Sequence, residues 1–160
     1  MIAPGDDIPS VPVKLVDAAG SADADARDVL SADRVVFFTV PGAFTPTCHT
    51  NHLPGYIELA DQIRARGVSR IVCGTVNDHH VVKAWAKASG ALDAVVFIAD
   101  GNAALCRALG LDKDMSASGM GTRYIRAAIV IDRGKVEAVY AEQAPGEVTT
   151  SGAHAVLASL

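Results

Sequence analysis

The chain has 160 residues, of which 50% are apolar and 20% are charged. This length and balance predict one folded domain, residues 1–160, and exclude a chain that is disordered throughout, because disorder requires low hydrophobicity and high net charge. The formal net charge is -4 and no basic stretch is interleaved with aromatic residues, so we expect no nucleic-acid partner. No apolar run approaches the roughly 18 residues of a membrane span.

The chain contains three cysteines, Cys48, Cys73 and Cys106. An odd number without a C-x-x-C pair is typical neither of a secreted disulfide framework nor of a zinc ribbon. The first ten residues carry two aspartates and no lysine or arginine, which is not typical of a signal peptide. We therefore expect reduced thiols and a cytoplasmic location.

Short apolar runs between turn-forming residues predict the strands. Residues 20–29 are small and polar, and we expect them to form a surface connection. Runs at 35–40, 69–76 and 94–99 predict buried strands. Residues 127–131 and 135–140 flank Asp132-Arg133-Gly134, which predicts a hairpin.

Apolar residues spaced three and four apart predict the helices between these strands. Gly67 ends the first long helix, while Asp78 is a suitable N-cap and Gly90 a suitable end for the second. The helices are expected at residues 53–66, 81–88, 102–109 and 152–160.

This order of elements predicts an α/β fold with a mixed central sheet flanked by helices on both faces. The thioredoxin fold has the same order. Functional sites in open α/β sheets form at the carboxyl ends of strands, which directs attention to residues 41–48.

Residues 41–48 join a buried strand to the first long helix. Pro46 suits the first turn of a helix, and Thr45 before it is a suitable N-cap. Cys48 then lies in the first turn, where free N–H groups and the helix dipole favour a thiolate. Because the thiolate is the nucleophile, Cys48 is the candidate reactive group; position alone also leaves open a buried, inert cysteine.

This segment reads P-G-A-F-T-P-T-C and resembles the active-site motif of the peroxiredoxins, in the form found in the type II, or peroxiredoxin-5-like, subfamily. The similarity extends from about Gly5 onward and includes His52 to Tyr56 and Gly121 to Arg126. The resemblance implies a thioredoxin-like fold and a thiol-dependent reduction of hydrogen peroxide and organic hydroperoxides. It implies no metal and no organic cofactor, with glutathione and glutaredoxin, or thioredoxin, as the reductant.

Carried over to this chain, the resemblance implies roles for single residues. Cys48 is then the peroxidatic cysteine, which is oxidised to a sulfenic acid. The hydroxyl of Thr45 hydrogen-bonds both the thiolate and the peroxide. Pro41 shields the thiolate from bulk water, and Gly42 supplies backbone close to the substrate.

Arg126 matches the arginine that points at the site in this family, with Arg123 as the competing candidate. Arg126 stands between apolar Ile125 and Ala127, where a solvated charge would be out of place. Peroxide cleavage builds negative charge on the leaving oxygen, which a guanidinium, a fixed hydroxyl and free helix-end amides stabilise.

The chain departs from the family pattern in three places. Some type II relatives carry a resolving cysteine near the C-terminus, but residues 147–151 contain none, so we expect a one-cysteine cycle. His79-His80 replaces a proline and an aromatic residue near the dimer face of relatives, which leaves the implied homodimer in doubt. His49, where serine is common, is assigned no catalytic role.

Two other functions stay open at this point. A thioredoxin-like dithiol exchanger would carry C-x-x-C where this chain has Thr45 to Cys48, and the threonine argues against it. A metal-binding or holdase module is the second alternative, because Cys48 and His52 have i,i+4 spacing and His49, His79 and His80 occur nearby.

Overall fold

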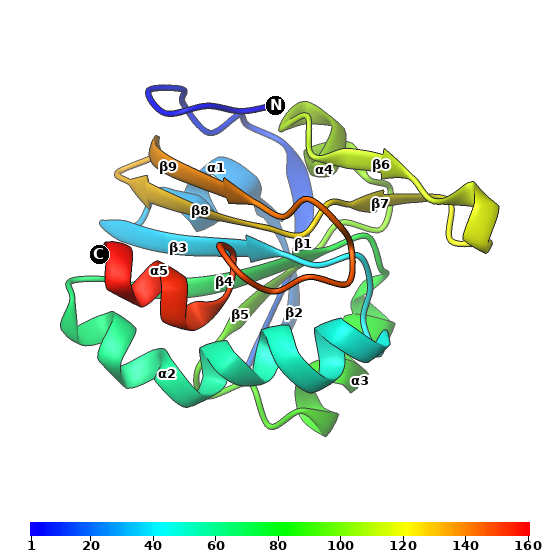
Figure 1. Ribbon diagram of the computed structural model, residues 1–160, viewed down its shortest axis with the longest axis horizontal. Coiled ribbons are helices and arrows are strands. Elements are labelled where there is room, and N and C mark those ends of the chain that lie inside the picture. The colour runs from blue at the N-terminus through cyan, green and yellow to red at the C-terminus, as the bar shows by residue number, and fades with distance from the viewer.

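The computed structural model describes residues 1–160 and is built around a seven-stranded sheet in the order β2-β1-β5-β4-β3-β8-β9 (Figure 1). Strands β3, β4 and β5 are parallel, whereas β8 pairs antiparallel with β3 and β1 pairs antiparallel with β5. The predicted mixed sheet is therefore confirmed. The strands span Pro12–Asp17 (β1), Gly20–Asp25 (β2), Arg34–Thr39 (β3), Arg70–Thr75 (β4), Val96–Ala99 (β5), Ala127–Asp132 (β8) and Lys135–Ala141 (β9).

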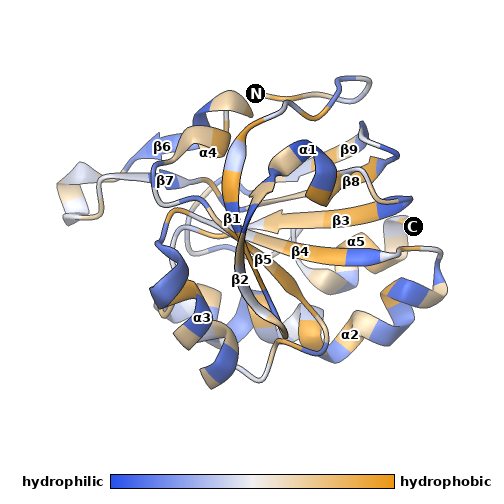
Figure 2. Ribbon diagram, turned by 180° about the vertical axis from the view of Figure 1, so that it is seen from behind, coloured by the Kyte–Doolittle hydropathy of each residue, from blue (hydrophilic) through white to orange (hydrophobic).

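Helices cover both faces of this sheet, as predicted. One core lies under α2, α3 and α5 and contains Tyr56, Trp85 and Val156; the other lies under α1 and α4 and contains Leu30 and Leu105. Figure 2 shows the apolar strands between helices whose outer faces are hydrophilic. The helices span Ala26–Leu30 (α1), Leu53–Ala65 (α2), His79–Ala88 (α3), Ala104–Ala108 (α4) and Ala153–Ser159 (α5).

The prediction of a surface connection at residues 20–29 is wrong. Residues Gly20–Asp25 form the edge strand β2, which pairs with β1 from Asp17 to Pro12. The carboxylate of Asp25 then accepts a hydrogen bond from the Arg27 N–H and caps α1. Small polar residues suffice for β2 because an edge strand has a partner on one side only and little of its surface is buried.

The predicted strands and hairpin of the central sheet are otherwise confirmed within a few residues. At the β8–β9 turn, Arg133 and Gly134 both have positive φ angles, of 50° and 81°, as a two-residue hairpin turn of the common type requires. The apolar patterns did not predict β1, nor the small sheet of β6 (Asp112–Asp114) and β7 (Thr122–Tyr124). This small sheet carries the turn Ser116–Ser118 and forms an arm that projects from the molecule in Figure 1.

The carboxyl ends of β3, β4 and β5 meet at one edge of the sheet because these three strands are parallel. Residues 40–48 follow β3 at this edge, Asn77 and Asp78 follow β4, and Asp100 follows β5. The amino end of β8 lies at the same edge, because Ala127 pairs with Thr39. Arg126, which precedes β8, is thus brought beside the segment that contains Cys48.

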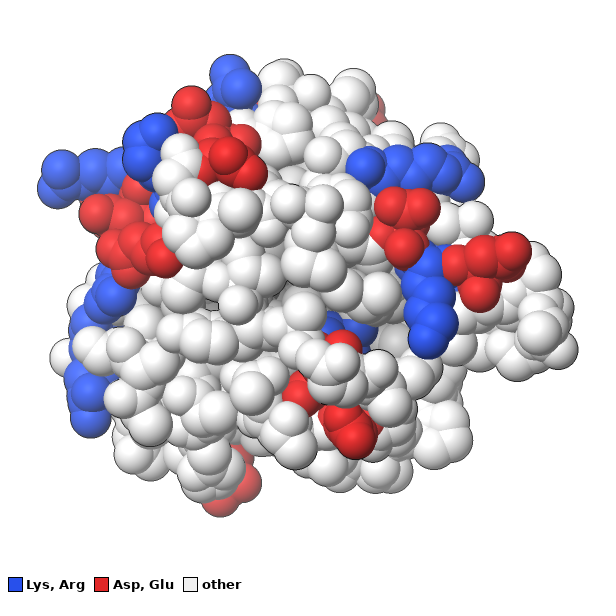
Figure 3. Space-filling model, turned by 45° about the horizontal axis from the view of Figure 1, so that its top comes forward, with Lys and Arg blue, Asp and Glu red and all other residues white.

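Positive and negative side chains are interspersed on the face of the molecule drawn in Figure 3 and do not gather into one basic patch. None of the helices combines the length and the apolar character that crossing a bilayer would need.

Candidate active site

The segment after β3 is folded on itself by Thr45. The hydroxyl of Thr45 donates a hydrogen bond to the carbonyl oxygen of Gly42 at 2.7 Å, and the Thr45 carbonyl accepts the first helical hydrogen bond, from His49. Thr45 therefore occupies the predicted N-cap position, and Pro46 the predicted first turn. The prediction that the Thr45 side chain caps the helix is wrong, because the hydroxyl is turned back to Gly42. The implied hydrogen bond from this hydroxyl to the Cys48 sulfur is not formed in the structure either, for the same reason.

The helix that begins at Pro46 contains one widened turn. Residues Cys48–His52 are π-helical, and the Leu53 N–H donates to the Cys48 carbonyl five residues back. Pro54 accounts for this geometry, because proline has no N–H to donate and its ring clashes with the carbonyl four residues earlier. Single π-helical turns of this kind are frequent at functional sites.

The amide groups at the start of this helix are free. The N–H groups of Thr47 and Cys48 have no acceptor within the protein, as expected for the first turn of a helix. They belong to Cys48 itself and to the residue before it, and the side chain of Cys48 is completely buried. The predicted combination of a cysteine with free helix-end donors is thus present in the structure.

Arg126 is in direct contact with Cys48. Its Nη2 donates to the Cys48 Sγ at 3.2 Å, its Nη1 lies 2.9 Å from the Nδ1 of His52, and its Nε donates to the Pro145 carbonyl at 3.0 Å. Only 2% of Arg126 is exposed, so the alternative of a solvated strand residue is wrong. The sulfur of Cys48 thus accepts a hydrogen bond from a buried cationic donor.

The competing arginine, Arg123, contacts the neighbouring backbone instead of the sulfur. It donates to the carbonyl of Pro41 at 3.2 Å and to that of Met120 at 2.8 Å. A Cβ at Gly42 would lie 2.8 Å from the Arg123 Nη1 and 3.0 Å from the Thr45 Cγ2. Glycine at position 42 therefore allows this close packing around the candidate site.

His52 is the residue at this site whose role the sequence analysis did not find. It is 1% exposed, with its Nδ1 facing Arg126 and its Nε2 lying 3.0 Å from the Ser151 carbonyl. A ring that satisfies both partners is neutral, with its proton on Nε2. Burial lowers the pKa of His52 to about 4; the Ser151 carbonyl opposes this and the Arg126 charge adds to it. The i,i+4 spacing from Cys48 was the available signal.

Asn77 was also missed as a supporting residue. Its Oδ1 accepts hydrogen bonds from the Ala43 N–H at 2.9 Å and from the Thr75 hydroxyl at 2.6 Å. It thereby ties the segment before Thr45 to the end of β4. Its position directly after a buried strand was the only sequence signal.

The segment between β9 and α5, residues 142–151, is named here the C-terminal strap. It supplies the Pro145 carbonyl to Arg126 and the Ser151 carbonyl to both His52 and the hydroxyl of Tyr56. In Figure 1 it runs as an orange loop from the end of β9 to α5. The strap therefore borders the candidate site and contacts it through backbone carbonyl groups.

The other two cysteines are buried away from any such donors. Cys73 lies in β4 within the core, as predicted, and burial raises the pKa of its thiol well above the usual value. Cys106, whose exposure the sequence did not reveal, is also fully buried in α4. Burial, followed by the charge of Asp100, raises the pKa of Cys106 to about 12.

The other histidines of the metal-binding alternative lie in two different helical segments. His49 accepts a hydrogen bond from the indole N–H of Trp85 at 3.1 Å, and the rings of His79 and His80 lie 4.1 Å apart in the first turn of α3. No group of three or more histidine, cysteine or acidic side chains is placed to hold a metal ion.

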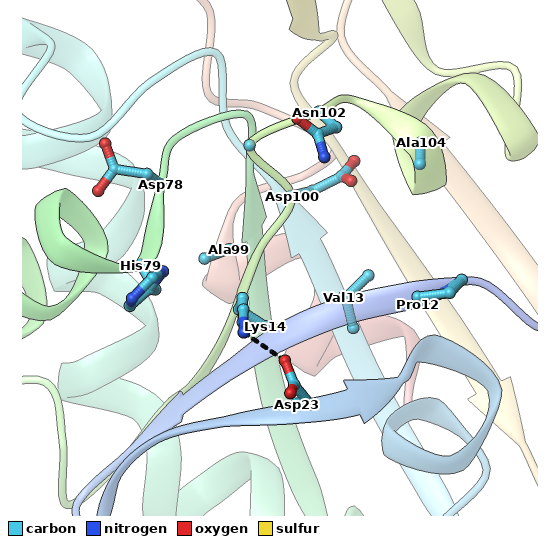
Figure 4. Close-up of a pocket in the computed structure, with 11 residues that line it drawn as sticks. Pro12, Val13, Lys14, Asp23, Asp78, His79, Ala99, Asp100, Asn102 and Ala104 are labelled. Carbon is cyan, nitrogen blue, oxygen red and sulfur yellow. Dashed lines mark hydrogen bonds and ion pairs between the residues drawn. The ribbon is translucent and has the colours of Figure 1, made fainter.

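A cavity of about 350 Å³ lies between β1, β2 and the start of α3 (Figure 4). Its carboxylates and its lysine already have structural partners: Asp78 caps α3, Lys14 pairs with Asp23, and Asp100 accepts from the Cys106 N–H and other donors. It contains no cysteine. A smaller cavity of about 50 Å³ is lined by Pro41, Arg126 and Pro145 among others, and it borders the candidate site.

Comparisons with known proteins agree with this site. Residues 3–157 match the family model described as Redoxin, and Peroxiredoxin-2B of Arabidopsis thaliana is 38% identical over 160 residues, which cover 99% of this chain and 98% of the plant protein. The chain belongs to the peroxiredoxin family. The named relatives are of type II, so the predicted subfamily is confirmed.

Solved structures confirm the thioredoxin-like fold of this peroxiredoxin. Reduced Prx3 from Vibrio vulnificus in complex with hydrogen peroxide is 41% identical, with a TM-score of 0.92 over 99% of both chains. A protein from Burkholderia cenocepacia described as a putative thioredoxin reductase is 43% identical, with a TM-score of 0.95 over 100% of this chain and 98% of that chain. Peroxiredoxins are thiol peroxidases, so the predicted reduction of hydroperoxides by a thiol-dependent oxidoreductase is confirmed.

The burial of neutral His52 makes stability depend on pH. In the unfolded chain His52 takes up a proton near pH 6.5, whereas the folded protein resists it until about pH 4. The stability from neutral His52 is thus complete above pH 6.5 and lost as the pH falls through 4, by on the order of 3 kcal/mol. We expect His52→Asn, which keeps an acceptor toward Arg126, to remove this slope in urea unfolding measured from pH 7 to 4.

The exposed His154 provides the control for this experiment. His154→Asn should keep the slope of the wild type. An unchanged slope in His52→Asn would show that His52 is not the group responsible.

Proposed function

We propose that Cys48 is the peroxidatic cysteine of this peroxiredoxin, with Thr45 and Arg126 as the other catalytic residues and Pro41 and Gly42 as backbone that borders the substrate. The observation that carries the proposal is the 3.2 Å contact between the Arg126 Nη2 and the Cys48 Sγ. Cys73 and Cys106 have no comparable donor, and their thiols are held in the neutral form by burial.

In the proposed reaction, the Cys48 thiolate attacks one oxygen of the hydroperoxide. An S–O bond forms, the O–O bond breaks, and the leaving oxygen takes the bonding electron pair and then a proton from solvent to give water or an alcohol. Cys48 becomes a sulfenic acid. Arg126, the Thr45 hydroxyl and the free N–H groups of the helix start stabilise the charge on the oxygens as it develops.

We propose that an external thiol regenerates Cys48. The thiol condenses with the sulfenic acid to a mixed disulfide and water, and a second thiol releases the reduced cysteine. Glutathione with glutaredoxin, or thioredoxin, is the proposed reductant. The burial of Cys73 and Cys106, and the absence of cysteine from the C-terminal strap, support this one-cysteine cycle.

The dithiol alternative has less support. A dithiol exchanger forms a disulfide, which requires two sulfurs with Cα atoms within roughly 7 Å. This chain has Thr45 where a C-x-x-C motif would place its first sulfur. The metal-binding alternative lacks a set of ligands.

A homodimer and a cytoplasmic location are part of the same proposal. Phe44, beside the catalytic segment, is one of two large apolar side chains that are strongly exposed, at 49%, and this exposure supports a contact surface there. The three thiols without a disulfide support a reducing compartment.

Loss of the peroxidatic sulfur should abolish turnover. We expect Cys48→Ser to have no measurable hydroperoxide consumption, whereas Cys73→Ser and Cys106→Ser keep activity because neither sulfur reaches the peroxide. Turnover of hydrogen peroxide with each reductant supplied separately measures this. Activity near the wild-type level in Cys48→Ser would disprove the proposal.

Thr45 and Arg126 should control the rate of Cys48 oxidation. Thr45→Val removes one donor while keeping the shape of the side chain, and such a loss typically slows a reaction by ~10²–10³-fold. Arg126→Lys should also be slower, because lysine cannot address three acceptors in one plane. Stopped-flow oxidation by hydrogen peroxide tests both, with Arg123→Lys as the matched control; a larger loss at Arg123 would reverse the assignment of the two arginines.

Oxidised Cys48 should remain a sulfenic acid until an external thiol is added. After one equivalent of hydrogen peroxide, we expect non-reducing peptide mass spectrometry to find a trapped sulfenic acid at Cys48, and a mixed disulfide once glutathione is added. Without an external thiol, excess peroxide should carry Cys48 further along the oxidation ladder. A stoichiometric disulfide from Cys48 to Cys73 or Cys106 would instead show a two-cysteine enzyme.

A further inference from the structure

Glu142 holds the C-terminal strap closed on itself. It follows directly after β9, and its carboxylate accepts hydrogen bonds from the N–H groups of Thr149 (2.8 Å), Thr150 (3.2 Å) and Ser151 (3.4 Å). The hydroxyls of the same three residues also donate to it, that of Ser151 at 2.9 Å. Partial burial raises the pKa of Glu142, but the donors on Thr149 and Ser151 outweigh this and bring it to about 2.

The closed strap places two backbone carbonyl acceptors at the site. The carbonyl of Pro145, inside the closed segment, receives the Arg126 Nε–H, and the carbonyl of Ser151 fixes the tautomer of His52, whose other nitrogen faces the Arg126 Nη1. The Glu142 N–H also donates to the Arg126 carbonyl at 2.9 Å. Three separate contacts of Arg126 thus depend on where the strap lies.

We propose that Glu142 is a positioning residue for the peroxidase reaction: by clamping Thr149, Thr150 and Ser151 it holds the strap that aims the Arg126 guanidinium at the Cys48 sulfur. This inference rests on the proposed role of Cys48. Glu142 makes no hydrogen bond to the Cys48 sulfur, and no ion pair joins it to Arg126. Its effect on the reaction passes through the strap.

The direction in which a Glu142 variant changes the thiolate fraction of Cys48 separates a positioning role from a long-range charge effect. A carboxylate near the site disfavours a second negative charge, so removing it would by electrostatics alone increase the thiolate fraction of Cys48. Loosening Arg126 would decrease that fraction, because the sulfur loses its cationic donor. A purely structural role would lower the melting temperature and leave the thiolate fraction unchanged.

The test uses Glu142→Gln, which keeps the size of the side chain but places an amide N–H against the donors of the strap. We expect a lower thiolate fraction, measured by ultraviolet absorbance across a pH titration, and about 10- to 100-fold slower oxidation by hydrogen peroxide in stopped flow. Glu142→Asp, which keeps the acceptor charge, should recover part of the rate. Ser151→Ala, which removes a single donor of the clamp, should move both readouts less and in the same direction.

Glu147→Gln is the matched control, because Glu147 is an exposed carboxylate of the same strap whose side chain makes no hydrogen bond in the structure. It should leave the rate and the thiolate fraction at wild-type values.

In an Arg126→Lys background, Glu142→Gln should add little, since both changes act through the same contact. A folded Glu142→Gln or Ser151→Ala variant with an unchanged or higher thiolate fraction and wild-type rate would overturn the proposal. Hydrogen peroxide consumption that survives Cys48→Ser would instead refute the assignment of Cys48.

Discussion

The candidate active site is organised around a buried cation that has no carboxylate partner. Arg126 is almost entirely enclosed, and burying an unpaired charge is costly unless its donors are satisfied. Two of its three acceptors, the Pro145 carbonyl and the His52 ring, are neutral. The third is the sulfur of Cys48, so the arrangement is balanced in charge when that sulfur is a thiolate.

The need of buried Arg126 for three acceptors is met by several segments that are distant in the sequence and meet at one edge of the sheet. The parallel strands bring the helix start with Cys48 to the carboxyl edge, and the antiparallel pairing of β8 with β3 brings Arg126 to the same place. His52 has to stay neutral to accept from Arg126, and its burial secures that. The C-terminal strap adds the Pro145 carbonyl as a neutral acceptor, where a carboxylate would have competed with the sulfur for the cation.

Much of this architecture follows from local pattern in the sequence. The buried strands, the long helices and the placement of Cys48 at a helix start all come from apolar runs, glycine and proline. Arg126 could be chosen over Arg123 only through the family resemblance, which implies an arginine immediately before the strand run. The strand Gly20–Asp25 could not be predicted, since its residues have low β-propensity and are ordered by pairing with β1.

The supporting residues of the site were beyond the reach of sequence pattern for a different reason. His52 meets Arg126 across 74 residues of chain, and only the tertiary fold decides that contact. Glu142 binds backbone N–H groups and hydroxyls of a short loop, groups that every loop of this composition offers. A residue whose partner is backbone leaves no complementary side chain in the sequence by which it could be recognised.

The hydrogen bond between Trp85 and His49 has an optical consequence. Trp85 is the single tryptophan of the chain, and its indole N–H is held by the residue that directly follows Cys48. Indole emission responds to changes in hydrogen bonding and polarity around the ring. Any oxidation state of Cys48 that shifts its π-helical turn will therefore be reported by the intrinsic fluorescence of one residue, without a label and without a second tryptophan elsewhere in the fold.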